Sequence, residues 1–288
     1  MDRLPYLFCD VVVGTINNFD RLQKHLATFE NSRFSKWKSA FEDHMSNRQN
    51  LQLWICFVDG SWSYTFFKLK GGTCKSYDFK TVQQLRRKYI QISGVDYASR
   101  LKRYNSSFKE IDEITKFISP FVNLAFLHLY NNEIEEKDLS LLLSYFKNAQ
   151  FYRIDVDHHR TCNEELLLTQ MRSDFLICVQ IEGDDWPKEV QLGLEELVLK
   201  KSFKVAYCED SNFVFQKPFF ENLFKVPKPA EEMLLDGKFS FDIKELKVFK
   251  TDLQFHSVHK TFTWKRADGV CISVNDMTGF LQITITPP

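Results

Sequence analysis

The chain has 288 residues, of which 44% are hydrophobic and 15% aromatic, enough to fill the core of two or three structural units. Its 38 basic and 38 acidic side chains give a net charge of zero, which removes the whole-chain attraction that draws basic proteins to nucleic acid or to anionic membranes. The seven cysteines contain no Cys-x-x-Cys pair, so we expect neither a disulfide framework nor a structural zinc site.

The sequence also lacks the patterns that would direct it out of the cell or into a membrane. The N-terminus has no secretory signal pattern, and no segment reaches the roughly eighteen uninterrupted apolar residues that span a bilayer. We therefore expect a cytoplasmic or nuclear protein whose partners are neither membranes nor nucleic acid.

Residues 1–47 have a helical pattern and are predicted to form a unit of three helices. Pro5 suits the first turn of a helix. Apolar side chains then recur at helical spacing in three stripes. These stripes are Leu7, Phe8, Val11 and Val12; Leu22, Leu26 and Phe29; and Trp37, Ala40, Phe41 and Met45.

Residues 48–72 are predicted to form a β-hairpin. Two strand patterns, 51–58 and 61–67, meet at Asp59-Gly60, a dipeptide that favours the tight turn between antiparallel strands. Gly71-Gly72 ends the segment.

Residues 73–226 are predicted to form an array in which helices and strands alternate. The strand patterns start 35, 27, 24 and 28 residues apart, mostly within the range of repeats that contain one helix and one strand. Such a pattern indicates a parallel sheet backed by helices. The strand patterns are 89–92, 124–129, 151–156, 175–181 and 203–208, and the helical patterns are 79–88, 107–118, 137–147, 163–172 and 187–200.

Residues 227–288 are predicted to form a β-rich cap. Pro227-Lys228-Pro229 interrupts the regular pattern and marks the boundary. The strand patterns that follow are separated by turns and indicate a small antiparallel meander. They are 238–241, 246–249, 261–265, 270–274 and 280–286.

No residue cluster predicts catalysis, a cofactor or a metal. Adjacent His158 and His159 in extended backbone would point to opposite sides, so the polar residues near Asp155 are interpreted as a solvated loop. Asp184-Asp185 precedes a helix that starts near Pro187, where acidic residues suit the helix dipole. The basic segment Arg86-Arg87-Lys88 is interpreted as the solvated face of a helix. No phosphate loop, nucleophile elbow or zinc-protease motif is present.

The N-terminal segment resembles an F-box. Leu4-Pro5 is followed by an apolar helix, and Trp37 comes late, within Phe34-Ser35-Lys36-Trp37-Lys38. F-box motifs open with Leu-Pro, pack three helices and dock on a Skp1-type adaptor of a cullin-based ubiquitin ligase. The family's Val-Cys segment has no counterpart here, since residues 26–33 read Leu-Ala-Thr-Phe-Glu-Asn-Ser-Arg. The resemblance implies that the adaptor would contact Leu4, Pro5, Leu7, Phe8 and Trp37.

Almost the whole chain is also similar to a large nematode family of F-box-like proteins. The similarity is carried by the opening Met-Asp-x-Leu-Pro-Tyr-x-Phe-Cys-Asp, by Trp37-Lys38, by Asn47-Arg48-Gln49-Asn50-Leu51 and by Ser119-Pro120-Phe121-Val122-Asn123-Leu124. Such proteins combine an F-box-like unit with a substrate domain of leucine-rich-repeat or F-box-associated type. An alternative interpretation of residues 4–45 is a plain three-helix cap over the first edge of the sheet.

These observations predict an α/β protein: an F-box-like helical unit, a hairpin, a leucine-rich-repeat-like helix-strand array with a parallel sheet, and a β-rich cap. We expect a non-enzymatic substrate receptor, with a stand-alone scaffold and, less favoured, a small-molecule enzyme as alternatives. Polar and aromatic side chains on the outward side of the strands would contact the target. These residues are Tyr130, Arg153, Asp155, Gln180 and Tyr207.

Overall fold

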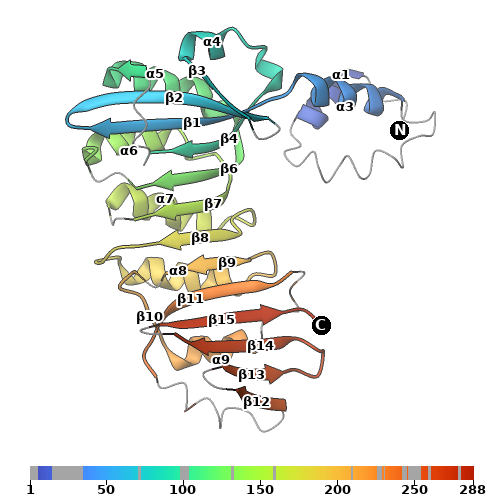
Figure 1. Cartoon of the computed structure of the whole chain (residues 1–288), viewed down its shortest axis with the longest axis vertical. Coiled ribbons are helices and arrows are strands. Elements are labelled where there is room, and N and C mark those ends of the chain that lie inside the picture. The colour runs from blue at the N-terminus through green and yellow to red at the C-terminus, as the bar shows by residue number, and fades with distance from the viewer. Residues whose placement is uncertain are drawn as a thin grey trace. The chain divides into compact units, whose positions relative to one another are not determined.

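A computed structural model shows an α/β chain that divides into two compact units, residues 1–125 and 126–288 (Figure 1). The boundary falls inside strand β6 (Val122–Leu129). The sequence predicts four segments, residues 1–47, 48–72, 73–226 and 227–288, and the boundaries between them stay predictions. The structure describes residues 6–14, 35–70, 73–97, 104–130, 133–157, 160–208, 210–225, 229, 231–241, 245, 254–258, 261–277 and 280–288.

The centre of the first unit is the hairpin of β1 (Gln49–Val58) and β2 (Ser61–Lys70). Asp59 and Gly60 both have positive φ angles, 52° and 73°, as the tight turn between twisted antiparallel strands requires. The hairpin prediction is therefore confirmed.

Three more strands extend this hairpin. β4 (Ile90–Asp96) pairs with β1 in parallel, whereas β3 (Thr73–Tyr77) and β5 (Tyr104–Ser106) both pair with β2 in antiparallel orientation. The sequence did not predict β3 or β5, because neither segment has the apolar alternation of a buried strand.

The first unit contains four described α-helices, α1 (Tyr6–Gly14), α3 (Ser35–Asn47), α4 (Phe79–Gln83) and α5 (Phe108–Ile118). Ser107 caps α5 by accepting a hydrogen bond from the Glu110 amide at 3.3 Å, as helix starts require. The prediction of a helix through Lys88 is wrong, since α4 ends at Gln83 and the short 3-10 helix η3 (Arg87–Tyr89) follows.

Helices α1 and α3 pack on each other around a small core of their own. Cys9 and Val13 of α1 are fully buried against Ala40 and Phe41 of α3, and Trp37 packs at the margin. The middle helix expected at residues 22–29 lies outside the described residues.

The second unit contains the helix-strand array. β7 (Phe151–Val156), β8 (Cys178–Ile181), β9 (Val205–Tyr207) and β11 (Met233–Phe239) lie side by side in chain order, each parallel to the next. The residues of β6 that belong to this unit lie on the other side of β7, and the two-residue β10 (Val214–Phe215) pairs with the end of β11. The parallel array is confirmed in this coarse form, whereas its likeness to leucine-rich repeats stays a prediction.

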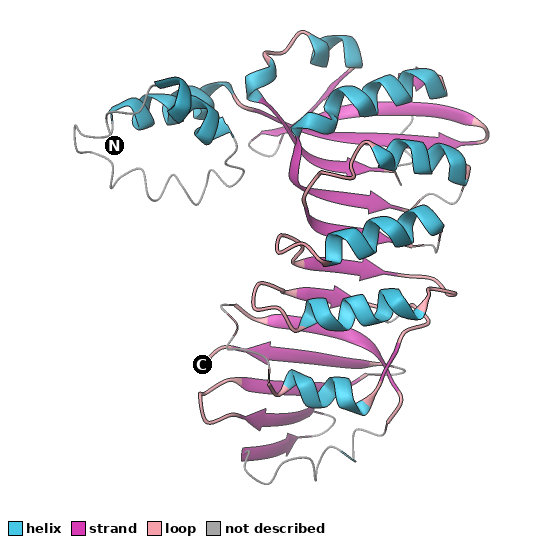
Figure 2. Ribbon diagram, turned by 180° about the vertical axis from the view of Figure 1, so that it is seen from behind, coloured by secondary structure: helices cyan, strands magenta, loops and turns pink. Residues whose placement is uncertain are grey.

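The helices of the second unit all lie on one face of the sheet (Figure 2). They are α6 (Glu136–Ser144), α7 (Thr161–Met171), α8 (Lys188–Val198) and α9 (Lys217–Leu223). Cross-strand neighbours on this side are 1% exposed or less, because the helices cover them. These neighbours are Ile154, Val179, Ala206 and Leu235.

An antiparallel meander, as the sequence predicts, completes the part of the sheet that belongs to the second unit. The chain runs through β12 (Gln254–Val258), β13 (Thr261–Lys265), β14 (Cys271–Asp276) and β15 (Leu281–Thr286), and β15 pairs with β11. The meander therefore reaches the array through its last strand. Trp264, only 1% exposed, packs against Phe220 and Phe224 at the helix side of the meander.

The predicted strand at 246–249 lies outside the described residues. Two other predicted strands are shorter than expected: 175–181 becomes β8 from Cys178, and 203–208 becomes β9 from Val205. Among the described helices, none is long and apolar enough to cross a bilayer.

Candidate functional site

Within the second unit, the face of the sheet opposite the helices carries a line of polar side chains, which we call the polar row. It consists of Asp155, Gln180, Tyr207, Asp236 and Gln282, one from each of five neighbouring strands and each directly opposite the next in register. Residues in register share one face of a sheet. We call this side the open face; Figure 1 shows it in front of the helices.

One end of the polar row contains a bidentate ion pair between Arg153 and Asp155. Arg153 Nε donates to both carboxylate oxygens of Asp155 at 2.9 Å, and Arg153 Nη2 lies 2.8 Å from Oδ2. Asp155 is 9% exposed, and its hydrogen bond raises the pKa of the Arg153 guanidinium. Such fork geometry fixes both side chains, so Asp155 holds Arg153 in place while Arg153 reaches the surface.

Glu182 joins two further residues of the open face. Its Oε1 accepts hydrogen bonds from Tyr130 Oη at 2.9 Å and from Gln180 Nε2 at 2.6 Å. Burial, then the hydrogen bond to Glu182, raise the pKa of Tyr130, and the charge of Asp155 adds to the shift. Four of the five predicted target residues therefore lie close together around two carboxylates.

The fifth predicted target residue, Tyr207, lies opposite Gln180 and half-buried on the neighbouring strand. Glu182 was not predicted, although it lies two residues beyond Gln180, the spacing that places side chains on one face of a strand.

Asp236 was missed as well. It lies between Tyr207 and Gln282 in the polar row and is 6% exposed, and no described residue donates a hydrogen bond to its buried Oδ1. Burial raises the pKa of its carboxyl, while a hydrogen bond with Gln282 opposes the rise. A buried carboxylate oxygen without a donor is unusual, because leaving one unpaired costs free energy.

The helical pair α1–α3 brings together the described part of the predicted adaptor contact. Leu7 is 70% exposed and Phe8 47% exposed, and the Phe8 ring meets the half-buried Trp37 edge-on, with centroids 6.2 Å apart. Leu4 and Pro5 lie outside the described residues. Both side chains are apolar and largely exposed, so a partner that covered them would remove apolar surface from water.

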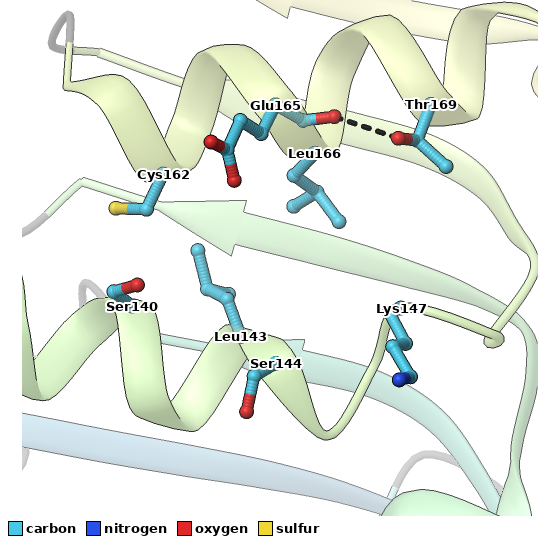
Figure 3. Close-up of a pocket in the computed structure, with 8 residues that line it drawn as sticks. All are labelled: Ser140, Leu143, Ser144, Lys147, Cys162, Glu165, Leu166 and Thr169. Carbon is cyan, nitrogen blue, oxygen red and sulfur yellow. Dashed lines mark hydrogen bonds between the residues drawn. The ribbon is translucent and has the colours of Figure 1, made fainter.

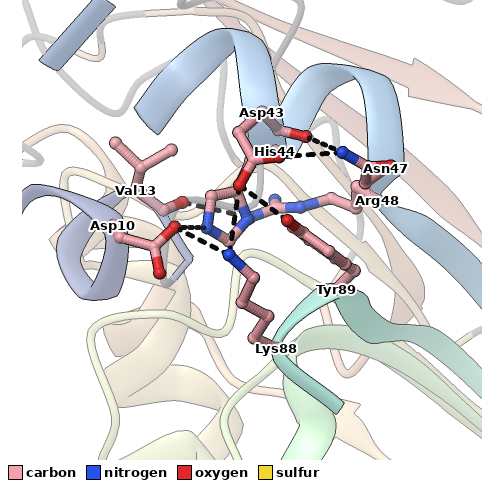
Figure 4. Close-up of polar contacts among 8 residues, drawn as sticks. All are labelled: Asp10, Val13, Asp43, His44, Asn47, Arg48, Lys88 and Tyr89. Atoms are coloured by element: carbon pink, nitrogen blue, oxygen red, sulfur yellow. Dashed lines mark hydrogen bonds and ion pairs between the residues drawn. The ribbon is translucent and has the colours of Figure 1, made fainter. Parts of the chain in front are cut away.

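A polar network attaches this helical pair to the rest of the first unit (Figure 4). Lys88 Nζ lies 3.4 Å from Asp10 on α1 and 3.1 Å from Asp43 on α3. Tyr89 Oη donates to Asp43 at 2.6 Å, and this bond is the main cause that lowers the pKa of Asp43. Arg86, Arg87 and Lys88 are all exposed, as a solvated basic segment should be, but they do not lie on one α-helix, and Lys88 forms ion pairs with both α1 and α3.

The same network continues through His44 and Arg48. His44, 1% exposed, is 3.1 Å from Asp10 through its Nε2, and burial lowers the pKa of its imidazole. Arg48 donates to the backbone carbonyl of Val13 at the end of α1 and to Gln91 Oε1 in β4, both at 3.0 Å. Burial lowers the Arg48 pKa to about 10. The orientation of α1 thus depends on specific polar contacts.

A groove of about 240 Å³ lies between α6 and α7 (Figure 3). It is smaller than the usual pocket for a small ligand, and burial raises the pKa of the Cys162 thiol that lines it. A thiol with a raised pKa is a poor nucleophile. The lining residues are Ser140, Leu143, Ser144, Lys147, Cys162, Glu165, Leu166 and Thr169.

The polar segment near Asp155 does not form a metal centre within the described residues, where no group of three potential ligands converges. His158 and His159 lie outside them. Asp184 and Asp185 are exposed in the turn before α8, as expected, and Pro187 occupies the cap position directly before the helix.

Comparison with known proteins identifies no family. No protein-family model matches the sequence. No curated protein is significantly similar to it. Any functional conclusion therefore depends on the two surfaces themselves.

Proposed function

We propose that this chain is a non-enzymatic substrate receptor. In this proposal α1 and α3 dock on a Skp1-type adaptor of a cullin-based ubiquitin ligase, and the open face of residues 126–288 contacts the protein to be modified. The observation that carries the adaptor part is the exposure of Leu7 (70%) and Phe8 (47%) on a helix fixed by the polar network.

The adaptor part follows from how α1 is held. Asp10 and the Val13 carbonyl are occupied by polar contacts, while Cys9 and Val13 fill the small core. Leu7 and Phe8 are left on the outward side of the helix, where apolar side chains gain free energy only when a partner removes them from water. Leu7 and Phe8 are two of the residues that the sequence resemblance to an F-box implies for the adaptor contact.

The target part is supported by the pre-organised side chains of the open face. Arg153 and Gln180 are each tied to a carboxylate, and Tyr130 shares Glu182 with Gln180. Side chains that are already ordered lose little conformational freedom on binding, so such a surface gains affinity from each contact.

Binding to purified Skp1-type adaptor tests the proposal. The full chain should form a one-to-one complex, and Leu7→Asp should weaken it at least about tenfold, because a charge would be buried in an apolar contact. Leu192→Asp is the matched control, since Leu192 is an exposed leucine (47%) on helix α8. A folded chain that captures no adaptor would eliminate the ligase role.

A stand-alone scaffold is the second candidate, and one observation favours it. The open face and its hydrogen bonds lie entirely within residues 126–288 and include no residue of α1 or α3. A chain that binds a target through Tyr130 and Arg153 but ignores the adaptor would fit this candidate.

A further inference from the structure

The loops that follow β8 and β9 join into one acidic edge beside the open face. Gly183 N donates to the Asp210 carbonyl at 2.9 Å, which links the two loops. Trp186, 3% exposed, donates from its backbone to Asn212 Oδ1 at 3.1 Å and from its ring to the Glu182 carbonyl at 2.9 Å. These contacts fix the two loops relative to each other. We define the acidic edge as Glu182, Asp184, Asp185 and Asp210.

The acidic edge has no basic residue of its own. Segments 182–187 and 208–213 contain no lysine or arginine, and Asp184, Asp185 and Asp210 are exposed. Lys238, on β11 nearby, donates to the Ser211 carbonyl at 2.7 Å. Like charges held on fixed loops repel one another and create a negative potential that attracts a cationic partner.

A second observation in the same region is the unpaired carboxylate oxygen of Asp236. The Asp236 carbonyl accepts hydrogen bonds from Cys208 N at 3.1 Å and Cys208 Sγ at 2.8 Å, so Asp236 lies next to the loop that carries Asp210. Its side chain lies on the open face, opposite Tyr207, and its buried Oδ1 receives no hydrogen bond from the part of the chain that the structure describes. An ammonium or guanidinium group would supply the missing donor.

We propose that the partner segment received by the open face is basic: an extended protein segment whose lysine or arginine side chains lie along the acidic edge and reach toward Asp236. This inference rests on the proposed role of the open face as the target surface and adds the chemistry of the target. A polyanion such as nucleic acid would be repelled by the same carboxylates. A lone divalent cation is disfavoured, because no three described ligands converge.

The test uses the full chain and two labelled peptides, one of alternating lysine and serine and one of alternating glutamate and serine. Fluorescence anisotropy should detect binding of the lysine peptide, weakened by added salt, and no binding of the glutamate peptide. The triple variant Asp184→Asn/Asp185→Asn/Asp210→Asn should weaken binding at least about tenfold. Asparagine suits position 185, where φ is +68°.

A triple variant with the same change in charge is the control. Glu165→Gln/Glu189→Gln/Glu196→Gln removes three exposed carboxylates from α7 and α8 on the helix face, and binding should stay within about twofold of the parent chain. Equal losses in both triple variants, or failure of the lysine peptide to bind, would overturn the proposal. Adaptor binding measured on the same proteins separates the two hypotheses, since the acidic edge contributes nothing to the Leu7 contact.

Discussion

Replacing Arg48 with methionine should detach α1 from its support. The substitution removes the two 3.0 Å hydrogen bonds to the Val13 carbonyl and to Gln91 Oε1, and it leaves both acceptors without that donor. Each hydrogen bond from a charged donor is worth about 1.5 to 3 kcal/mol. Arg48 is only half-buried, so water replaces part of the loss.

Methionine keeps the packing of the aliphatic stem, and the cost of burying a guanidinium disappears as well. We therefore expect a net loss of about 2 to 3 kcal/mol from the free energy of unfolding of the first unit. Helix α1 has nine residues, too few to persist in isolation, so its amide hydrogens should exchange much faster in the variant.

Urea unfolding followed by tryptophan fluorescence measures the stability, and hydrogen exchange with mass spectrometry localises the loss. Arg172→Met is the matched control, because Arg172 is an exposed arginine after α7 and its replacement should cost less than about 0.5 kcal/mol. Two results would contradict the support of α1 by Arg48: an Arg48→Met variant as stable as the parent chain, or amide hydrogens of α1 that exchange as slowly as before.

Four further substitutions, in three experiments, test the interior of the structure and the pH dependence of its stability. Arg153→Ala should lower the free energy of unfolding by about 3 kcal/mol, measured by chemical denaturation, because it leaves the 9% exposed Asp155 unpaired. Adding Asp155→Ala should recover part of that loss. No recovery would contradict the ion pair as the cause. Gly237→Ala should lower the free energy of unfolding by about 1 to 3 kcal/mol, since the alanine Cβ would lie 2.7 Å from the Phe215 ring. An unchanged melting temperature would show that the packing around Gly237 is looser than described. Burial lowers the folded-state pKa of His44, with Asp10 opposing and Arg48 and Lys88 adding to the effect, so the unfolded chain binds the proton more tightly. The stability that His44 contributes should therefore be complete above the unfolded-state pKa of about 6.5 and should fall as the pH drops below it. His44→Gln should remove this part of the pH dependence. If the free energy of unfolding of the variant and of the parent chain changed in parallel with pH, this role of His44 would be refuted.

Local sequence signals predicted the elements that depend on near neighbours. Asp59-Gly60 encodes a tight turn by itself, and the pattern 151–156 matches β7 at both ends. The order of strands in the array also follows from local pattern, because parallel strands joined through helices tend to pair with their chain neighbours.

Features that depend on distant contacts could not be predicted in this way. The end of α4 at Gln83 places Lys88 beside Asp10 and Asp43, and neither contact is visible in the helical pattern. Leu124, with a φ of +48° inside a strand, adopts a conformation that no local signal for leucine indicates.

The residues of the two proposed binding surfaces were predicted in part for the same reason. Alternation along single strands placed Tyr130, Arg153 and Gln180 on one side, and it also covers Glu182, two residues beyond Gln180. The bond between Tyr130 and Glu182 and the place of Asp236 opposite Tyr207 depend instead on which strands are neighbours and in which register. Register is set by tertiary packing, so a single sequence does not reveal which carboxylates gather.

Hydrogen exchange of the full chain, alone and with each of two probes, tests most directly whether the protein has two separate binding surfaces. Purified Skp1-type adaptor should slow exchange in α1 and α3, and the lysine peptide should slow exchange in segments 182–187 and 210–213. Protection by both probes in the same segment, or protection confined to α6, α7 and α8, would contradict the account.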